Sequence, residues 1–221
     1  MMLELKSLKK TYQQGDEKIE IYNDLNFSLK EGEQVAIMGK SGAGKSTFLS
    51  LVSGIIKADS GDIVLNNISY NDLQENELND FRASNIGFIF QNFHLVSYLN
   101  ALENVMLPAK VCGISNPKEK AIELLKAVGL EHRLNHIPSQ LSGGEKQRVA
   151  IARALIHNPK IILADEPSGN LDEETGIAVM DKLFELIKQN NTTLILVTHS
   201  KDVAARCEKT YQLAHGVLNL C

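Results

Sequence analysis

The feature that most restricts the fold of this chain is a glycine-rich segment between an apolar run and a helix-forming run. Residues 39–46 read GKSGAGKS, which fits the pattern G-x-x-x-x-G-K-[ST]. The apolar run Gln34–Met38 before it predicts a buried strand, and Ser46–Ile56 after it predicts a helix. The glycines allow consecutive backbone N–H groups to turn inward around phosphate oxygens. The segment therefore predicts a phosphate-binding loop in an α/β domain that binds a nucleotide.

Two side chains of this loop are suited to a nucleoside triphosphate. The ammonium group of Lys45 would reach the β- and γ-phosphates, and the hydroxyl group of Ser46 would bind Mg²⁺. The positive end of the following helix dipole adds to the attraction. The loop residues that we expect to contact the nucleotide are Gly39, Lys40, Ser41, Gly42, Ala43, Gly44, Lys45, Ser46 and Thr47.

Strand and helix patterns alternate along the rest of the chain. The first third indicates β structure, with an alternation that includes Ile19, Ile21, Leu25, Phe27 and Leu29. Further strands are predicted at Ile63–Leu65, Ile86–Phe90, Ile161–Ala164 and Thr193–Thr198. Helices are predicted at Ala101–Leu107, Pro117–Val128 with Asn116 as its cap, Gly144–Ile156 and Glu173–Lys188. This order predicts a single α/β domain with a parallel sheet and a helical insertion at about residues 92–157.

Two carboxylates follow an apolar strand and are candidates for metal binding and catalysis. Asp165 and Glu166 come directly after Ile161–Ala164. Ligands of parallel α/β sheets bind at the carboxyl ends of the strands. We therefore expect Asp165 to hold Mg²⁺, directly or through water, and Glu166 to orient and deprotonate an attacking water molecule. The alternative is a solvated strand end with no function.

A second anion site is predicted where residues 141–145, LSGGE, open an Ala-rich helix. Ser142 and Glu145 fit the capping box S-x-x-E, so an ordinary helix cap is the simpler interpretation. The paired glycines nevertheless leave N–H groups exposed at the positive end of a helix dipole. A monomer with one nucleotide has no need of a second phosphate site. Two chains related by a two-fold axis could each complete the site of the other.

Composition excludes several other classes. The 221 residues carry 23 Lys and Arg against 27 Asp and Glu, a net charge of −4, which argues against a protein that coats nucleic acid. The 3 cysteines are scattered and do not form a disulfide framework or a zinc motif, so we expect a reducing compartment. The chain begins without an apolar run of signal-peptide length, and no apolar stretch approaches the roughly 20 residues of a membrane span.

Together these segments resemble the ATP-binding subunit of an ABC transporter along nearly the whole chain. The segment LSGGE is highly specific between a Walker A and a Walker B motif. The resemblance implies a P-loop NTPase, RecA-like core at about 1–91 and 158–221. It also implies a mixed sheet, an N-terminal antiparallel β part and an inserted α-helical subdomain at about 92–157. It further implies ATP and Mg²⁺ as cofactors, ATP hydrolysis, and two chains that sandwich ATP head to tail.

The resemblance also assigns roles to particular residues. It implies that Tyr12 stacks on adenine, that Gln91 contacts Mg²⁺ and water, and that His199 contacts the γ-phosphate. The D-loop at the dimer seam corresponds to Ser168, Gly169, Asn170, Leu171 and Asp172. Ser142, Gly143, Gly144 and Glu145 would reach the ATP of the partner chain. Family members often have Thr in place of Ser168 and Asp in place of Ser200, and the latter change leaves the fine tuning of the switch open. We expect the other histidines to be structural or surface residues: His94, His132, His136, His157 and His215.

Within the family, residues 86–91, 99–108 and 164–172 are similar to the MacB-type branch, which includes the LolD, YbbA and FtsE groups. This similarity implies a separate integral membrane permease as the partner, and a peripheral position on the cytoplasmic face of the inner (plasma) membrane. It also implies lipoprotein release or export of lipophilic compounds, with no nucleic-acid partner. The alternatives are an FtsE-like cell-division ATPase and a soluble ABC ATPase of the iron–sulfur assembly type. The candidate docking face includes Gln91, Phe93, Leu95, Val96 and Leu99, with Phe93 and Leu99 as the pair expected at the surface.

Overall fold

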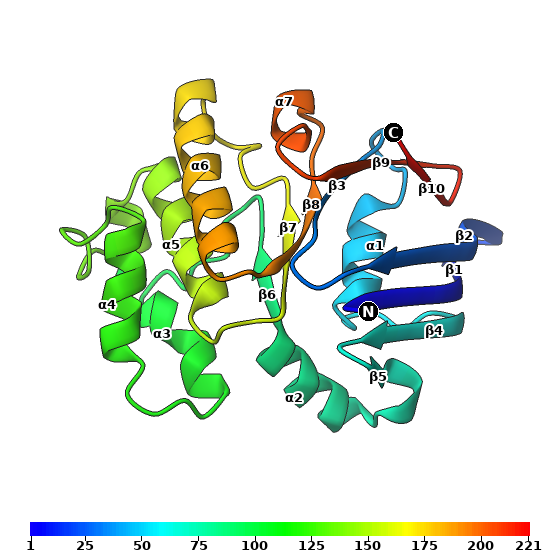
Figure 1. Ribbon diagram of the computed structural model, residues 1–221, viewed down its shortest axis with the longest axis horizontal. Helices are drawn as coiled ribbons and strands as arrows, with labels where there is room; N and C mark the ends of the chain where they lie inside the picture. Colours follow the sequence, from blue (N-terminus) through cyan, green and yellow to red (C-terminus); the bar gives the residue numbers. More distant parts are fainter. The chain divides into compact units, whose positions relative to one another are not determined.

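A computed structural model gives the structure of residues 1–221, which form two compact units (Figure 1). The first unit contains residues 1–82 and 193–221, and the second unit contains residues 83–192. The glycine-rich loop at residues 39–46 lies in the first unit, and segments 141–145 and 165–172 lie in the second.

The N-terminal half of the first unit is an antiparallel sheet. It consists of strands β1 (Leu3–Gln14), β2 (Glu17–Leu29), β4 (Ser60–Leu65) and β5 (Ile68–Ser69), in the order β2-β1-β4-β5. All neighbouring strands pair antiparallel, and β1 is the long central strand that pairs with both β2 and β4. The antiparallel β part that the sequence predicts is therefore present.

The loop-bearing strand β3 (Gln34–Met38) belongs to a mixed sheet. It lies between β8 (Thr193–Val197) and β9 (Lys209–Ala214) and runs parallel to both, while β10 (Val217–Leu220) pairs antiparallel with β9. Every residue of β8 is buried, as expected for a parallel strand covered on both faces. The helices of this part are α1 (Lys45–Val52), α7 (Lys201–Ala204) and α2 (Glu75–Asn85), which leads into the second unit. A 3₁₀ turn spans Tyr70–Asp72.

The second unit combines two parallel strands, β6 (Ile86–Ile89) and β7 (Ile161–Asp165), with four helices. The helices are α3 (Ala101–Val111), α4 (Lys118–Ala127), α5 (Gly143–Leu155) and α6 (Glu173–Gln189), and a 3₁₀ turn spans Pro138–Gln140. Helix α5 packs against α3, α4, α6 and β6. It carries a stripe of fully buried Ala, Val and Ile residues, which places it at the centre of this unit.

Four local predictions are wrong in detail. Helix α1 ends at Val52 instead of Ile56, because Gly54 adopts a φ of +69° that terminates it. Asn116 does not cap α4: Pro117 occupies the N-cap position and no side chain caps the helix. Helix α3 does not stop before Pro108 but continues to Val111, with Ala109 buried beyond the proline. In β2 the alternation holds only from Leu25 onward, because register shifts leave Ile19 exposed and Ile21 half-buried.

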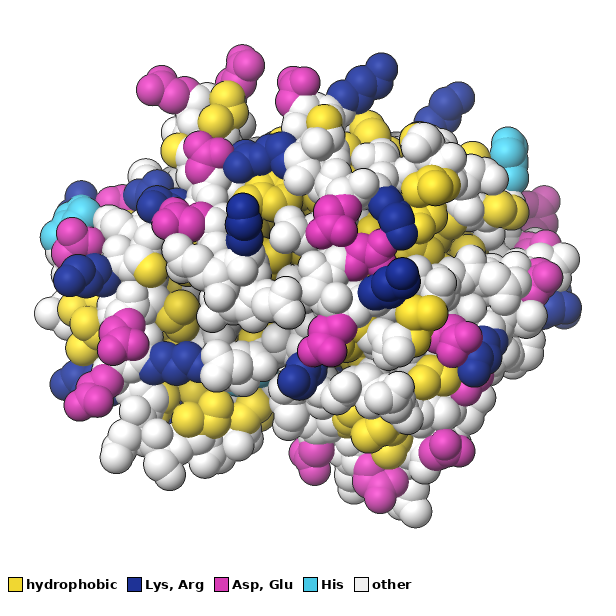
Figure 2. All heavy atoms as spheres, viewed as in Figure 1, with side chains coloured by type: hydrophobic (Ala, Val, Ile, Leu, Met, Phe, Trp, Pro, Cys, Tyr) yellow, Lys and Arg dark blue, Asp and Glu magenta, His cyan; other side chains and the backbone are white.

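No helix combines the length and the apolar character that crossing a bilayer requires. On the face in Figure 2, basic and acidic side chains are interspersed, and hydrophobic side chains show between them. This mixture agrees with the small net charge of −4.

Candidate functional site

The glycine-rich loop is held in its turn by close backbone approach and by its own lysine. A side chain at Gly39 would collide with the carbonyl oxygen of Leu213, 2.8 Å from the position of its Cβ atom. Gly44 has a φ of +98°, which L side chains rarely adopt, and it precedes α1. The ammonium group of Lys45 donates to the carbonyl oxygens of Gly39 (2.8 Å) and Lys40 (3.0 Å). Lys45 therefore lies across the inside of the loop, where the motif requires a cation.

Two residues of strand β2 contact the glycine-rich loop and hold it in place. The hydroxyl group of Tyr22 donates to the carbonyl oxygen of Gly44 at 2.7 Å. Burial raises the pKa of this hydroxyl, so it remains a donor at neutral pH. A Cβ atom at Gly44 would meet the Ile21 side chain at 2.9 Å, so only glycine fits between the loop and this strand. The antiparallel sheet thus fixes the position of the loop.

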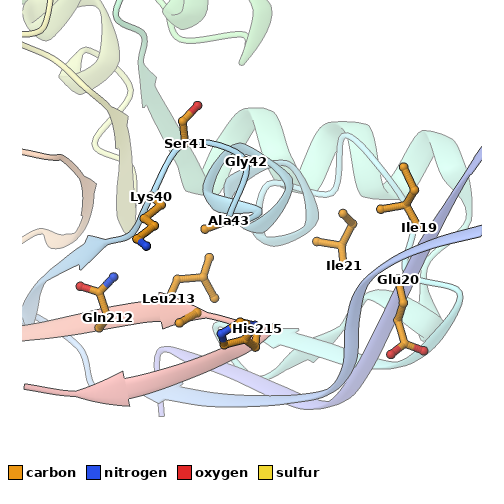
Figure 3. A pocket seen from close by; sticks show the side chains of 12 residues that line it. Ile19, Glu20, Ile21, Lys40, Ser41, Gly42, Ala43, Gln212, Leu213 and His215 are labelled. Atoms are coloured by element: carbon orange, nitrogen blue, oxygen red, sulfur yellow. The ribbon is translucent and has the colours of Figure 1, made fainter.

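A cavity of about 510 Å³ adjoins the loop within the first unit (Figure 3). The close-up shows Ile19 and Ile21 of β2 facing the loop at Gly42 and Ala43. The lining residues are Ile19, Glu20, Ile21, Lys40, Ser41, Gly42, Ala43, Gln212, Leu213, Ala214, His215 and Gly216. A cavity of this size, with apolar walls and a loop of backbone N–H groups on one side, suits a ligand that joins a flat ring to an anionic chain. His215, expected to be a structural or surface residue, is exposed at the surface and also lines this cavity.

Tyr12 lies next to this cavity but is not among its lining residues. It pairs across the strands with Ile19, which does line the cavity, and it is 40 % exposed. The ammonium group of Lys10 lies 5.3 Å from the centre of the Tyr12 ring. An accessible aromatic ring beside an apolar cavity is compatible with base stacking, which stays a prediction.

His199 follows the buried strand β8 and is exposed. The next residue, Ser200, is the N-cap of α7, and its hydroxyl oxygen accepts a hydrogen bond from the N–H of Val203 at 3.3 Å. Serine and aspartate are both good N-cap residues. Ser200 therefore supplies the same kind of cap as the Asp that the family resemblance leads one to expect at this position.

In the second unit, the two strand-end carboxylates stand on a strained turn. Asp165 ends β7, and Glu166 has a φ of +46°, in the left-handed region that non-glycine residues seldom occupy. The carbonyl oxygen of Glu166 accepts a hydrogen bond from the N–H of Gly169 at 2.9 Å, which closes the turn. Backbone strain of this kind concentrates at functional sites.

Gln91 and the 168–172 loop are joined by hydrogen bonds within the second unit. The amide nitrogen of Gln91 donates to the amide oxygen of Asn170 at 3.1 Å, and the amide nitrogen of Asn170 donates to the carbonyl oxygen of Gln91 at 3.0 Å. Asn170 also donates to the Asn92 side chain at 2.8 Å. A Cβ atom at Gly169 would lie 2.8 Å from the Gln91 amide. The sequence predicts both segments but not this contact between them.

The capping box at the start of α5 is confirmed. The Ser142 hydroxyl accepts from the N–H of Glu145 (3.2 Å), and the Glu145 carboxylate accepts from the N–H of Ser142 (2.8 Å). Arg133 donates to the other Glu145 oxygen at 2.8 Å and lies 3.2 Å from the ring nitrogen Nε2 of His136. The Ser142 N–H, and then Arg133, hold the pKa of Glu145 below its ordinary value.

The glycines after Ser142 allow close packing. A Cβ atom at Gly143 would lie 3.1 Å from Leu171, and one at Gly144 would overlap the methyl group of Thr175. Asp172 caps α6 by accepting from the N–H of Thr175 at 3.0 Å. The starts of α5 and α6, which carry the 142–145 and 168–172 segments, therefore pack on each other in the second unit.

The segment after Gln91 differs from the predicted surface. Phe93 and Leu99, the predicted surface pair, are both half-buried, whereas Tyr98 is 81 % exposed. Sequence reasoning missed Tyr98 because it belongs to no motif of its own. Phe93 and His94 have φ values of +60° and +48°, and Arg153 of α5 donates to both of their carbonyl oxygens.

The comparisons with known proteins agree with this arrangement. A family model described as "ABC transporter" matches residues 22–169. The chain is 46 % identical over 216 residues to a lipoprotein-releasing system ATP-binding protein LolD of Treponema denticola, covering 97 % of this chain and 96 % of that protein. It is 43 % identical over 219 residues to an uncharacterized ABC transporter ATP-binding protein, YbbA, of Escherichia coli K12, covering 98 % and 96 %.

Among solved structures, the fold matches a dimeric post-hydrolysis state of the ATP-binding cassette MJ0796 bound to ADP and Pi, from Methanocaldococcus jannaschii. The TM-score is 0.90 at 44 % sequence identity, and the match covers 99 % of this chain and 97 % of that one. The predicted P-loop α/β fold is therefore confirmed at the level of the whole cassette.

Proposed function

The chain belongs to the ABC transporter family of ATPases, and we propose that it is the ATP-hydrolysing subunit of a LolD-like transporter of the MacB-type branch. Its permease is then a separate membrane protein, and the chain works at the cytoplasmic face of the inner membrane. The observation that supports the proposal is that helices α1 and α5 begin at the glycine-rich segments 39–46 and 142–145, one in each unit, where a helix dipole favours an anion.

The first step of the proposed function is binding of ATP to the loop. The phosphates lie against the backbone N–H groups of residues 39–47, and Lys45 exchanges its loop carbonyl partners for the β- and γ-phosphate oxygens. The nucleoside occupies the adjoining cavity beside Ile19 and Ile21. Tyr12 stacks on adenine.

The three residues proposed as Mg²⁺ ligands each carry an oxygen donor of suitable chemistry. Ser46, Gln91 and Asp165 supply a hydroxyl, an amide and a carboxylate oxygen, and Mg²⁺ prefers such ligands together with phosphates and water. No group of three or more His, Cys, Asp or Glu side chains gathers to hold a metal ion. When bound, Mg²⁺ neutralises charge on the β- and γ-phosphates.

Hydrolysis follows from positioning of water and stabilisation of charge. Glu166 aligns the attacking water, while Lys45 and His199 stabilise the charge on the γ-phosphate. Ser142, Gly143, Gly144 and Glu145 contact the ATP of a second copy in the proposed head-to-tail dimer. The MJ0796 cassette, which this chain resembles closely, is dimeric with ADP and Pi. ATP binding then drives closure of the dimer, and hydrolysis resets it.

The proposed permease contact lies after Gln91. Tyr98 is exposed, and a cavity of about 360 Å³ in the second unit is lined by Phe88, Phe90, Leu107, Val111 and other residues. A helix of the permease with an apolar face would suit this surface. The hydrogen bonds from Gln91 to Asn170 connect the same segment to the proposed dimer seam.

The experiment that tests the proposal is affinity capture from detergent-solubilised membranes. The Glu166→Gln chain is used as bait with ATP, and captured proteins are identified by mass spectrometry. Recovery of a multi-span permease supports the transporter function, and the size of its extracytoplasmic domain distinguishes LolD-like from FtsE-like partners. Recovery of soluble partners alone, with a folded bait and intact membranes, would contradict it and favour the iron–sulfur assembly alternative. A Lys45→Ala bait is the matched control.

A further inference from the structure

A lysine two residues before Tyr12 is held in an unusually well-defined position. The Nζ atom of Lys10 lies 2.9 Å from the carbonyl oxygen of Lys57 and 3.0 Å from Oδ1 of Asp59. The same atom lies 5.3 Å from the centre of the Tyr12 ring, within the range of a cation–π interaction. Its side chain is only 14 % exposed, whereas long surface lysines normally extend into water.

Asp59 fixes this arrangement by contacting the backbone as well as the lysine. Its second carboxylate oxygen, Oδ2, accepts a hydrogen bond from the N–H of Thr11 at 2.6 Å. Its own N–H donates to the carbonyl oxygen of Lys9 at 2.9 Å. The hydrogen bond from Lys10 and then that from Thr11 lower the pKa of Asp59, so it is ionised at neutral pH. The backbone on both sides of Lys10 is therefore tied to the segment that follows α1.

We propose that Lys10, held by Asp59, is a positioning residue for the nucleotide base: its ammonium group occupies one face of the Tyr12 ring and leaves the other face for adenine. This inference rests on the proposed stacking of Tyr12 on the base. It assigns a role to Lys10 and Asp59, which lie outside the motifs described above. All the groups involved belong to the first unit.

Two physical effects follow from this geometry. A cation on one face of an aromatic ring draws electron density toward itself, which makes the opposite face a better partner for the electron-rich adenine ring. The cation also limits the orientations that Tyr12 can adopt, so less side-chain entropy is lost when the base binds. Asp59 lies seven residues after the end of α1. The base end and the phosphate end of the site are therefore connected through one short segment.

The test compares nucleotide with a ligand that has no base. Binding of ATP and of inorganic tripolyphosphate is measured by calorimetry for the wild-type chain and for Lys10→Met, and the KM and kcat of ATP hydrolysis are measured in parallel. We expect Lys10→Met to weaken ATP binding about two- to fivefold, the size of an exposed to partly buried cation–π contact. We expect its KM to rise in proportion, with kcat and tripolyphosphate binding unchanged.

Two further variants serve as controls. Lys10→Arg restores ATP affinity, because a guanidinium group also binds an aromatic face and can reach Asp59. Lys6→Met removes a lysine of the same strand whose exposed side chain contacts Glu4, and it leaves ATP affinity at the wild-type level. Thermal unfolding of each variant confirms that the strand remains folded.

The outcomes separate this inference from the proposed function. Tyr12→Ala alone tests the stacking. An unchanged ATP affinity for that variant overturns the stacking of Tyr12 on adenine and, with it, the role of Lys10. A weakened Tyr12→Ala variant combined with an unaffected Lys10→Met variant overturns only the role of Lys10. Equal losses of ATP and tripolyphosphate affinity in Lys10→Met would also overturn it, because the lysine would then act on the whole site. In a Tyr12→Ala background, Lys10→Met is expected to have no additional effect.

Discussion

Replacing Arg153 by Met should destabilise the second unit and release the segment after Gln91. Arg153 stands in α5 and donates to the carbonyl oxygens of His94 (2.5 Å) and Phe93 (2.7 Å). Those two residues adopt consecutive left-handed conformations, with φ values of +48° and +60°. Burial lowers the pKa of Arg153 to about 10, so it is still a cation at neutral pH and its hydrogen bonds are poorly screened by solvent.

The expected loss can be worked out from these contacts. A hydrogen bond from a charged donor contributes about 1.5–3 kcal/mol, so the pair contributes about 3–6 kcal/mol. Exposed His94 regains water at its carbonyl oxygen, and relaxation of the turn returns about 1–2 kcal/mol of strain. The free energy of unfolding should therefore fall by about 1–5 kcal/mol.

Urea unfolding measures this free energy, and amide hydrogen exchange shows where protection is lost. We expect faster exchange confined largely to residues 91–99. Arg153→Lys is the control with a partial loss. Its ammonium group keeps the positive charge but lacks the planar guanidinium group that donates to two carbonyl oxygens. It should lose about half as much stability. A loss below about 0.5 kcal/mol for Arg153→Met, or a larger loss with unchanged exchange at 91–99, would refute the reasoning.

Three other changes have defined outcomes. Lys45→Ala should abolish tight ATP binding in calorimetry, and unchanged affinity would contradict the loop assignment. Gly144→Ala should cost about 1–3 kcal/mol in urea unfolding, because the added methyl group overlaps Thr175, and Thr175→Ser should recover most of that loss. The pKa of Glu145 is lower in the folded chain than its ordinary value of 4.5, which applies to the unfolded chain. The carboxylate therefore stabilises the fold fully above pH 4.5, and this stabilisation is lost as the pH falls through the pKa of the folded chain. The stability difference between wild type and Glu145→Gln should therefore shrink below about pH 4.5, and a difference independent of pH would argue against this interpretation.

The parts of the site that sequence reasoning could predict are those whose chemistry is local. The 39–46 loop needs glycines, a lysine and a hydroxyl at fixed spacing, so its pattern specifies both its conformation and its ligand. The Ser142–Glu145 capping box is likewise contained in four residues and is confirmed. Strand β3 coincides with the predicted apolar run Gln34–Met38, because a strand buried on both faces has little polar sequence to obscure it.

Other features depend on residues far apart in the chain. Arg153 supports Phe93 and His94, and Asp59 supports Lys10, but neither pair has a spacing that any local pattern encodes. The β9–β10 hairpin, whose turn lines the cavity, alternates too weakly for the sequence to predict it. The sequence does not predict helix α2 either, because the helix is mostly polar and only Leu78 is buried. Such elements are specified by tertiary packing more than by local propensity.

The central claim is that two copies of this chain close around ATP, and one measurement tests it directly. The molar mass of the Glu166→Gln chain is determined by light scattering after size-exclusion chromatography, with and without ATP and Mg²⁺. The account predicts a monomer without nucleotide and a dimer with it, and no dimer when Lys45→Ala is added. A chain that binds ATP in calorimetry yet stays monomeric at saturating ATP would contradict the account.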